Sequence, residues 1–103
     1  MHVVSKGPFD EAAQKFPNDA KALNDVYRAF KRGNFSDPDD MREVFPSLDR
    51  MKYRDKWWVV DVGGNNLRLM FFADFEYGRL FIKSISTHAE YDKLVKKYRE
   101  NPA

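Results

Sequence analysis

The spacing of apolar side chains predicts two helices in the first third of the chain. Residues 9–16 place Phe and Ala side chains three and four positions apart, which is typical of one helix face, and Pro17 ends that segment because proline lacks a backbone donor. Residues 20–32 repeat this spacing after an Asn-Asp pair that can cap a helix, and Gly33 supplies the stop. The two segments indicate a helix pair packed on a flat surface.

The second half of the chain has the pattern of strands. Residues 57–62 are rich in aromatic and branched side chains, as in a buried strand, and residues 67–72 and 79–86 continue the pattern. A Gly-Gly-Asn-Asn stretch and a Glu-Tyr-Gly stretch separate the three segments and suit tight turns. They predict an antiparallel meander, and Val3 and Val4 suit a short strand that can join its edge.

Two further helices are predicted around the sheet. A cap-like Ser-Asp-Pro leads into a short turn of helix through residues 41–45, and Thr87 with Glu90 forms a capping box for a final helix. The basic face of that helix carries Lys93, Lys96, Lys97 and Arg99. The sequence thus predicts one α+β domain over residues 1–103, with an N-terminal helix pair on a small, mainly antiparallel sheet and a short C-terminal helix.

Composition and charge narrow the classes of function. The chain has no cysteine, which excludes disulfides and thiolate metal sites, and His2 and His88 are too few for a histidine-rich metal site. No apolar run approaches membrane-spanning length and the N-terminus lacks a signal-peptide core, so the cytoplasm is the expected location. Net charge is only +2, but residues 51–103 carry ten basic against seven acidic side chains, which makes this half the better candidate for meeting phosphates.

Three side chains around the end of the meander can carry chemistry. His88 is either an ordinary helix-start residue or a proton-exchanging group beside a bound anion, which free donors at a helix start attract. Arg68 lies inside the central strand, where its guanidinium needs a partner, either a phosphate or Asp61 across the hairpin. Tyr91 lies three residues after His88 on the same side of the helix, and either contacts a nucleotide or packs in the core.

Further cations precede or join the strands. Lys52, Arg54 and Lys56 alternate before the first meander strand, so they lie on one side if this stretch is extended. Such a strip suits a nucleic-acid backbone, and it equally suits an edge that resists strand addition. Lys83 lies in the third strand, where strict alternation groups it with Ile85 and leaves its face undecided.

The chain resembles a known toxin family in these same strands. Residues 63–69 (GGNNLRL) and 87–92 (THAEYD) are together specific to the HigB family, part of the RelE-like group of bacterial toxin–antitoxin systems. Residues 44–49 and 58–62 add to the likeness, which covers nearly the full length. The resemblance implies a RelE-like fold and an endoribonuclease that cuts messenger RNA, often on the translating ribosome, to stop growth.

The resemblance also implies a chemistry without metal or cofactor, in which the 2′-hydroxyl of the RNA attacks the neighbouring phosphate. Arg68 matches the strand arginine that RelE-like toxins direct at that phosphate, and His88 is then the general acid or base. The second proton-transfer group stays open among Lys56, Glu90 and Asp92. The expected catalytic residues are His88, Arg68, Tyr91 and Lys83, and the expected RNA-binding residues are Lys52, Arg54, Lys56 and Lys93.

Two functions from other classes fit the same residues. One is a non-catalytic RNA- or ribosome-binding module on the same scaffold. The other is a protein-interaction domain, for which the basic strip before the sheet would be dispensable. By resemblance the partners are a HigA-like antitoxin, docked on the helix pair or a sheet edge, messenger RNA and the ribosome, with no membrane.

Overall fold

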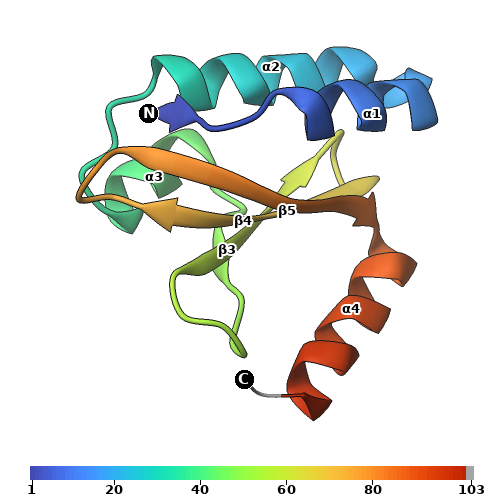
Figure 1. The fold of residues 1–103 in the computed structure, drawn as a ribbon. Helices are drawn as coiled ribbons and strands as arrows, with labels where there is room; N and C mark the ends of the chain where they lie inside the picture. The colour runs from blue at the N-terminus through green and yellow to red at the C-terminus, as the bar shows by residue number, and fades with distance from the viewer. Residues whose placement is uncertain (102–103) are drawn as a thin grey trace.

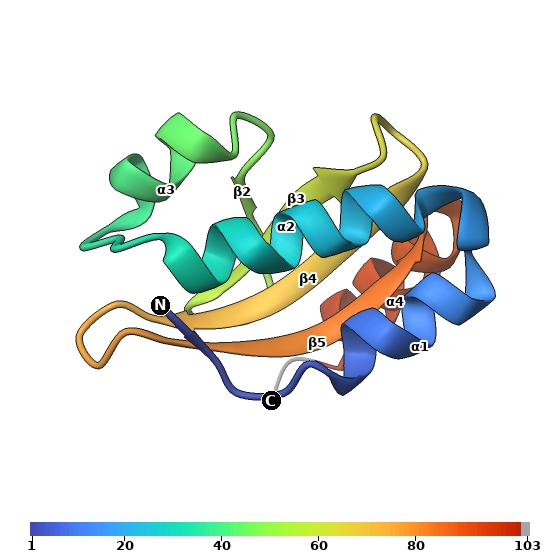
Figure 2. The same cartoon turned by 90° about the horizontal axis from the view of Figure 1, so that it is seen from above.

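Helices cover both sides of a five-stranded sheet (Figure 1). The computed structural model describes residues 1–101. Helices α1 (Gly7–Lys15) and α2 (Ala20–Arg32) lie side by side over one face, and α4 (His88–Glu100) lies on the other side, as Figure 2 also shows. The short α3 (Pro38–Val44) follows α2. The predicted α+β class is therefore confirmed, and within residues 1–101 no helix has the length and apolarity to cross a bilayer.

The sheet has the order β1-β5-β4-β3-β2. Antiparallel β3 (Trp57–Val62), β4 (Leu67–Asp74) and β5 (Arg79–Thr87) form the predicted meander. The edge strand expected at Val3 and Val4 is present one residue earlier as β1 (His2–Val3), which pairs parallel with β5. The unpredicted β2 (Asp49–Arg50) pairs antiparallel with β3, so the chain between them must reverse direction.

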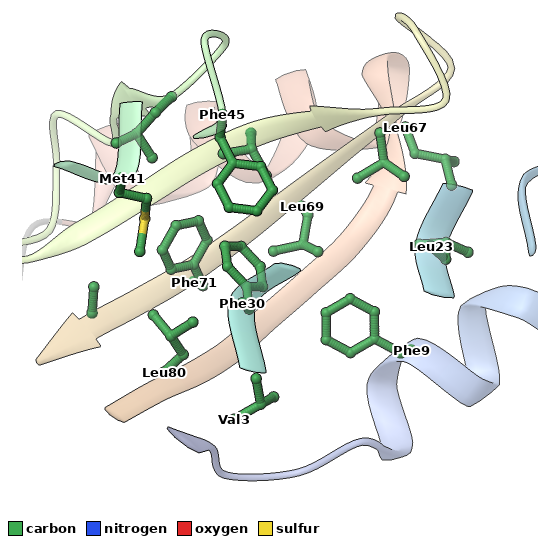
Figure 3. Packing of buried hydrophobic residues seen from close by; sticks show 14 of the residues in the cluster. Val3, Phe9, Leu23, Phe30, Met41, Phe45, Leu67, Leu69, Phe71 and Leu80 are labelled. Carbon is green, nitrogen blue, oxygen red and sulfur yellow. The ribbon is translucent and has the colours of Figure 1, made fainter. Parts of the chain in front are cut away.

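The alternation of β4 divides the molecule into two sides. The side chains at its odd-numbered positions point toward α1 and α2 (Figure 3), where Phe30 of α2 packs on Phe71 with ring centroids 5.1 Å apart. Leu67, Leu69, Phe71 and Ala73 are all at most 1% exposed. Burial of each large side chain there contributes about 1.5–3 kcal/mol. The intervening Arg68 consequently projects to the opposite face, which α4 only partly covers.

A β-bulge in β5 determines the face of the sheet on which Lys83 lies. Met70 pairs with Ser84 but Phe71 pairs with Ile82, so Lys83 is the extra residue in β5. Its ammonium lies 5.1 Å from the ring centre of Trp57, whereas Ile85 packs against the core. The grouping of Lys83 with Ile85 was therefore wrong, because the bulge resets the alternation between them.

Two helix ends use residues differently from the prediction. Asp19 precedes α2 but makes no side-chain cap; its carboxylate accepts a hydrogen bond from Asn66 Nδ2 at 3.1 Å, which ties the helix pair to the β3–β4 turn. Gly33 does end α2, with extended backbone rather than the left-handed conformation. A Cβ at this position would collide with the ring of Phe35, so close approach explains the glycine.

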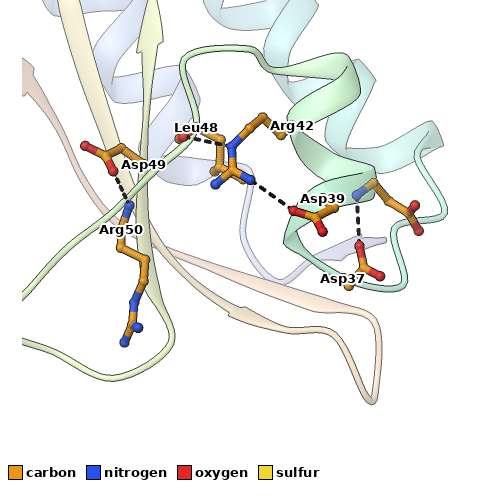
Figure 4. A network of polar contacts seen from close by, with 7 residues as sticks. Asp37, Asp39, Arg42, Leu48, Asp49 and Arg50 are labelled. Atoms are coloured by element: carbon orange, nitrogen blue, oxygen red, sulfur yellow. Dashed lines mark hydrogen bonds and ion pairs between the residues drawn. The ribbon is translucent and has the colours of Figure 1, made fainter.

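Polar contacts hold α3 and the segment that leads into β2 (Figure 4). The predicted cap is present, because Asp37 Oδ1 accepts from the Asp40 amide at 2.9 Å. Arg42 joins Asp39 at 3.1 Å and donates to the Leu48 carbonyl at 3.4 Å. These contacts position the chain that carries β2 toward the open face of the sheet.

The predicted capping box begins α4. Thr87 Oγ1 accepts from the Glu90 amide at 3.2 Å, and Glu90 Oε1 accepts from the Thr87 amide at 3.0 Å. Hydrogen bonds from the Thr87 backbone and side chain hold the pKa of Glu90 below its ordinary range. The folded state therefore favours the ionised carboxylate.

This lowered pKa predicts a pH-dependent contribution to stability. A carboxylate with a depressed folded-state pKa stabilises the fold above its unfolded pKa and loses that effect as pH falls through the folded pKa. Glu90→Gln should thus be less stable than the wild type above about pH 5, and the two should converge below about pH 4. Urea unfolding across this range measures the difference. The exposed Glu100→Gln is the control, and a difference that persists at low pH would contradict the assignment.

Candidate active site

Arg68 lies at the centre of the open sheet face. Its register partners are Asp61 on β3 and Ser86 on β5. Arg68 Nε is 3.3 Å from Asp61 Oδ1, so the cross-hairpin ion pair weighed from the sequence is present. The two side chains are 28% and 23% exposed, which leaves both charges only partly solvated. In the described part of the chain, the two terminal nitrogens of Arg68 donate no hydrogen bond and can meet a ligand.

His88 meets the same guanidinium from the first turn of α4. Arg68 Nε donates to His88 Nδ1 at 3.5 Å. An accepting Nδ1 is unprotonated, which places the proton of a neutral imidazole on Nε2. This Nε2 atom is buried and has no hydrogen-bond partner within residues 1–101. His88 therefore presents an unpaired donor beside the arginine.

Tyr91 completes the group one helical turn later. The guanidinium carbon of Arg68 lies 5.2 Å from the ring centre, which is a cation–π distance. Burial raises the pKa of the Tyr91 phenol; Arg68 opposes this, while the carboxylates of Asp49 and Asp92 add to it. The hydroxyl is thus a neutral hydrogen-bond donor at physiological pH. The predicted side-by-side placement of His88 and Tyr91 is correct.

A cavity of about 220 Å³ opens beside Arg68 and Tyr91, and His88 is not part of its lining. It lies between the sheet, α4 and the β2 segment, and Arg68 and Tyr91 form part of its wall. Its charged lining comes from Asp49, Arg50, Lys52, Arg68 and Asp92. Asp49 and Arg50 were missed in the sequence because β2 is only two residues long and has no strand pattern of its own.

The expected basic strip does not form. Residues 51–56 are a turn rather than an extended segment, because β2 and β3 pair antiparallel and the chain must reverse between them. Lys52 lines the cavity with Arg68, but Lys56 has a left-handed φ of 62° and lines a separate cavity beside Asp74. The expectation that the three cations share one side was wrong.

Arg54 is instead bound to the end of α4. Its guanidinium donates to the carbonyls of Tyr53 at 2.7 Å and Asn101 at 2.9 Å, and lies 4.6 Å from the ring centre of Tyr98. Tyr98 also contacts Trp57 of β3; the two rings pack edge-on with their centroids 5.3 Å apart. We call Arg54, Trp57 and Tyr98 the α4 anchor, because they attach the far end of the helix to the sheet.

The remaining candidate cations lie apart from Arg68. Lys83 is three positions along β5 from Ser86, the register partner of Arg68, which corresponds to roughly 10 Å of strand. Lys93 is exposed on α4 and does not line the cavity. Across residues 1–101, no group of three or more His, Cys, Asp or Glu side chains is arranged to hold a metal ion.

Comparison with known proteins identifies relatives along almost the whole chain. The HigB toxin family, described as the RelE-like toxic component of a toxin–antitoxin system, matches residues 19–94. An mRNA interferase HigB from Escherichia coli O6:H1 is 56% identical over 101 residues, which is 98% of each chain. The mRNA interferase toxin HigB of E. coli K12 is 36% identical over 99 residues, covering 96% of this chain and 95% of the relative.

The α4 anchor yields a prediction about Arg54. Arg54→Ala removes hydrogen bonds to carbonyls at the end of α4 and a cation–π contact, so we expect a loss of about 1–3 kcal/mol in unfolding free energy. Amide exchange in the last two turns of α4 should accelerate selectively. Arg99→Ala, at an exposed position of the same helix, is the matched control. Unchanged exchange in Arg54→Ala together with weaker RNA binding would show that Arg54 serves RNA instead.

Proposed function

Because the chain belongs to the HigB family of RelE-like toxins, we propose that Arg68, His88 and Tyr91 cut messenger RNA on the open face of the sheet. The chain is the toxin of a toxin–antitoxin system and an mRNA interferase. One observation carries the assignment of the site. A single half-buried guanidinium contacts a carboxylate, an imidazole and a phenol, and its terminal nitrogens have no partner within residues 1–101.

The reaction proposed is transesterification by the RNA itself. The 2′-oxygen attacks the adjacent phosphorus, a base removes the 2′ proton, and the bond from phosphorus to the 5′-oxygen breaks. The products are a 2′,3′-cyclic phosphate and a 5′-hydroxyl, which takes up one proton. The terminal nitrogens of Arg68 suit the phosphate oxygens, where negative charge grows in the transition state.

We assign the proton donor to His88. Donation to the leaving 5′-oxygen requires the imidazolium, so we propose that Nδ1, which accepts from Arg68 in the free protein, takes up a proton when Arg68 turns to the phosphate. The unpaired Nε2–H then gives its proton to the leaving oxygen, and the ring becomes neutral. An unpaired buried donor is costly in the free protein, and a substrate oxygen would satisfy it. The imidazole is thus oriented before RNA binds.

The geometry favours Asp92 as the base among the three groups left open. Lys56 lines a different cavity, and Glu90 is held by the capping box and by Lys15 at 3.4 Å. Asp92 lines the same cavity as Arg68 and Tyr91 and has no ion-pair partner within the described residues. Tyr91 would orient a nucleotide beside the cut through its hydroxyl or ring.

We propose different roles for the cations around the site. Lys52 shares the cavity and would attract the RNA backbone, as expected from the sequence. Lys83 and Lys56 lie away from Arg68 and would act only on more distant phosphates, together with Lys93. A toxin of this kind has an antitoxin partner; a HigA-like protein as that partner, and the translating ribosome as the place of cleavage, are part of the proposal.

Alanine variants of Arg68 and His88 test the proposed site. We expect induced wild-type chain to arrest bacterial growth and to create new 5′ ends inside translated regions of messenger RNA. Arg68→Ala and His88→Ala should each reduce these cuts by about 10²-fold or more, since each removes a transition-state contact or proton donor. Lys97→Ala, exposed on α4, is the control. Undiminished cuts in a folded double variant would move the chemistry elsewhere, and arrest without cuts would favour a binding module.

Asp92 and Glu90 can be separated by a matched pair of variants. Asp92→Asn removes the proposed base without changing side-chain size, so cleavage should fall by about 10²–10⁴-fold. Glu90→Gln should reduce cleavage only slightly, because glutamine can still serve the capping box. Single-turnover cleavage of a defined messenger RNA on programmed ribosomes measures both. Equal losses in the two variants would remove Asp92 from the role of base.

A further inference from the structure

A second positive surface lies on the helix layer, away from the proposed cleavage site. A groove of about 500 Å³ runs along the outer side of α2. Its lining consists of Lys6, Asn24, Tyr27, Arg28, Lys31 and Arg32. We call this the α2 groove. The sheet and its apolar core separate it from Arg68, since α1 and α2 cover one face and α4 lies on the other (Figure 2).

The cations of the α2 groove have few internal partners. Lys6 makes one long, exposed pair with Asp10 at 3.8 Å. Within residues 1–101, Arg28, Lys31 and Arg32 form no ion pair at all. Arg28 and Arg32 lie four residues apart on one helix face, where like charges destabilise a helix. The repulsion between Arg28 and Arg32 therefore lowers the stability of α2 slightly, and no ion pair within residues 1–101 offsets this loss.

The end of α2 does not require these charges either. Lys31 and Arg32 lie in the last turn of α2, where cations ordinarily offset the negative end of the helix dipole. In the structure, the amino group of Met1 donates to the carbonyls of Phe30 at 3.0 Å and of Gly33. Carbonyls at this helix end are thus already paired with a cation. The side-chain charges of Lys31 and Arg32 stay directed at solvent.

The composition of the groove indicates which anion it fits. No aliphatic side chain lines it, and its one aromatic ring, Tyr27, is occupied by Lys6 at 5.3 Å and by Phe9 at 5.3 Å. Protein interfaces usually have an apolar or aromatic centre, which is missing here. Arginine, lysine and asparagine side chains are instead the usual partners of phosphate oxygens in nucleic-acid backbones.

We propose that the α2 groove binds the phosphate backbone of RNA at a segment separate from the one being cut. This inference rests on the proposed function, since it assumes a protein that works on RNA. Because the sheet lies between the two surfaces, nucleotides next to the cut cannot reach the groove. The groove therefore adds affinity and salt dependence, and leaves the chemical step unchanged.

The test compares two triple variants with the same change of charge. The first neutralises the groove through Arg28→Gln, Lys31→Gln and Arg32→Gln, which preserves helix propensity. The control neutralises Lys15, Lys21 and Arg79 in the same way, each of which is paired with a carboxylate. Binding of a labelled messenger RNA fragment, made uncleavable by 2′-methoxy groups, is measured against salt concentration.

We expect the groove variant to lose about two units of the slope of log affinity against log salt, since three phosphate contacts on a single strand account for that much. The control should keep most of the wild-type slope. Single-turnover cleavage at saturating RNA should proceed at the same rate in wild type and groove variant, and thermal unfolding should show both variants folded.

Two results would overturn the inference. Equal slopes in the groove variant and the control would show that the groove makes no specific phosphate contact. Unchanged RNA binding with lost neutralisation by the co-expressed antitoxin would make the groove a protein-docking surface. Failure of the proposed function is distinguishable, because a wild-type chain that cuts no RNA still reports its binding slope with the uncleavable probe.

Discussion

The partly buried guanidinium of Arg68 determines how the open face of the sheet is arranged. A charge removed from water needs nearby groups that offset the cost, and neighbouring elements supply them. Asp61 reaches it from β3 at 3.3 Å, and His88 and Tyr91 reach it from α4. The first turn of α4 therefore docks where its imidazole and phenol meet the arginine. The same contacts orient the groups that we assign to RNA cleavage.

The two faces of β4 contribute to different parts of the molecule: one to the apolar core and the other to the proposed site. Side chains at odd-numbered positions from Leu67 to Ala73 form the apolar core under α1 and α2, and Arg68 between them faces α4. This arrangement leaves the helix layer free to present a second set of cations to solvent. The proposed cleavage site and the α2 groove are consequently independent surfaces, separated by the apolar core rather than joined in one continuous positive face.

The helix that carries His88 and Tyr91 is held mainly by contacts at its two ends. No residue of α4 is fully buried, so the helix gains little from core packing. The capping box fixes its start, and the α4 anchor attaches its end. Elements with few buried apolar contacts open at lower free energy than the core. The geometry around Arg68 thus depends on polar and aromatic contacts close to the surface.

The sequence by itself determined the helices and the meander, and it supplied the candidate residues of the site. Helical spacing, the strand-type composition of residues 57–62 and the Thr87–Glu90 cap are local signals, so they predicted the helix pair, the meander and the start of the helix that carries His88 and Tyr91. The resemblance to the HigB family pointed to Arg68 and His88 as the residues of the site. Only the tertiary structure decided the rest. The pairing of β2 with β3 turned residues 51–56 into a reversal and sent Arg54 to α4, and a bulge moved Lys83 toward Trp57. Strand pairing and bulges depend on partners distant in the chain, and no local pattern records them.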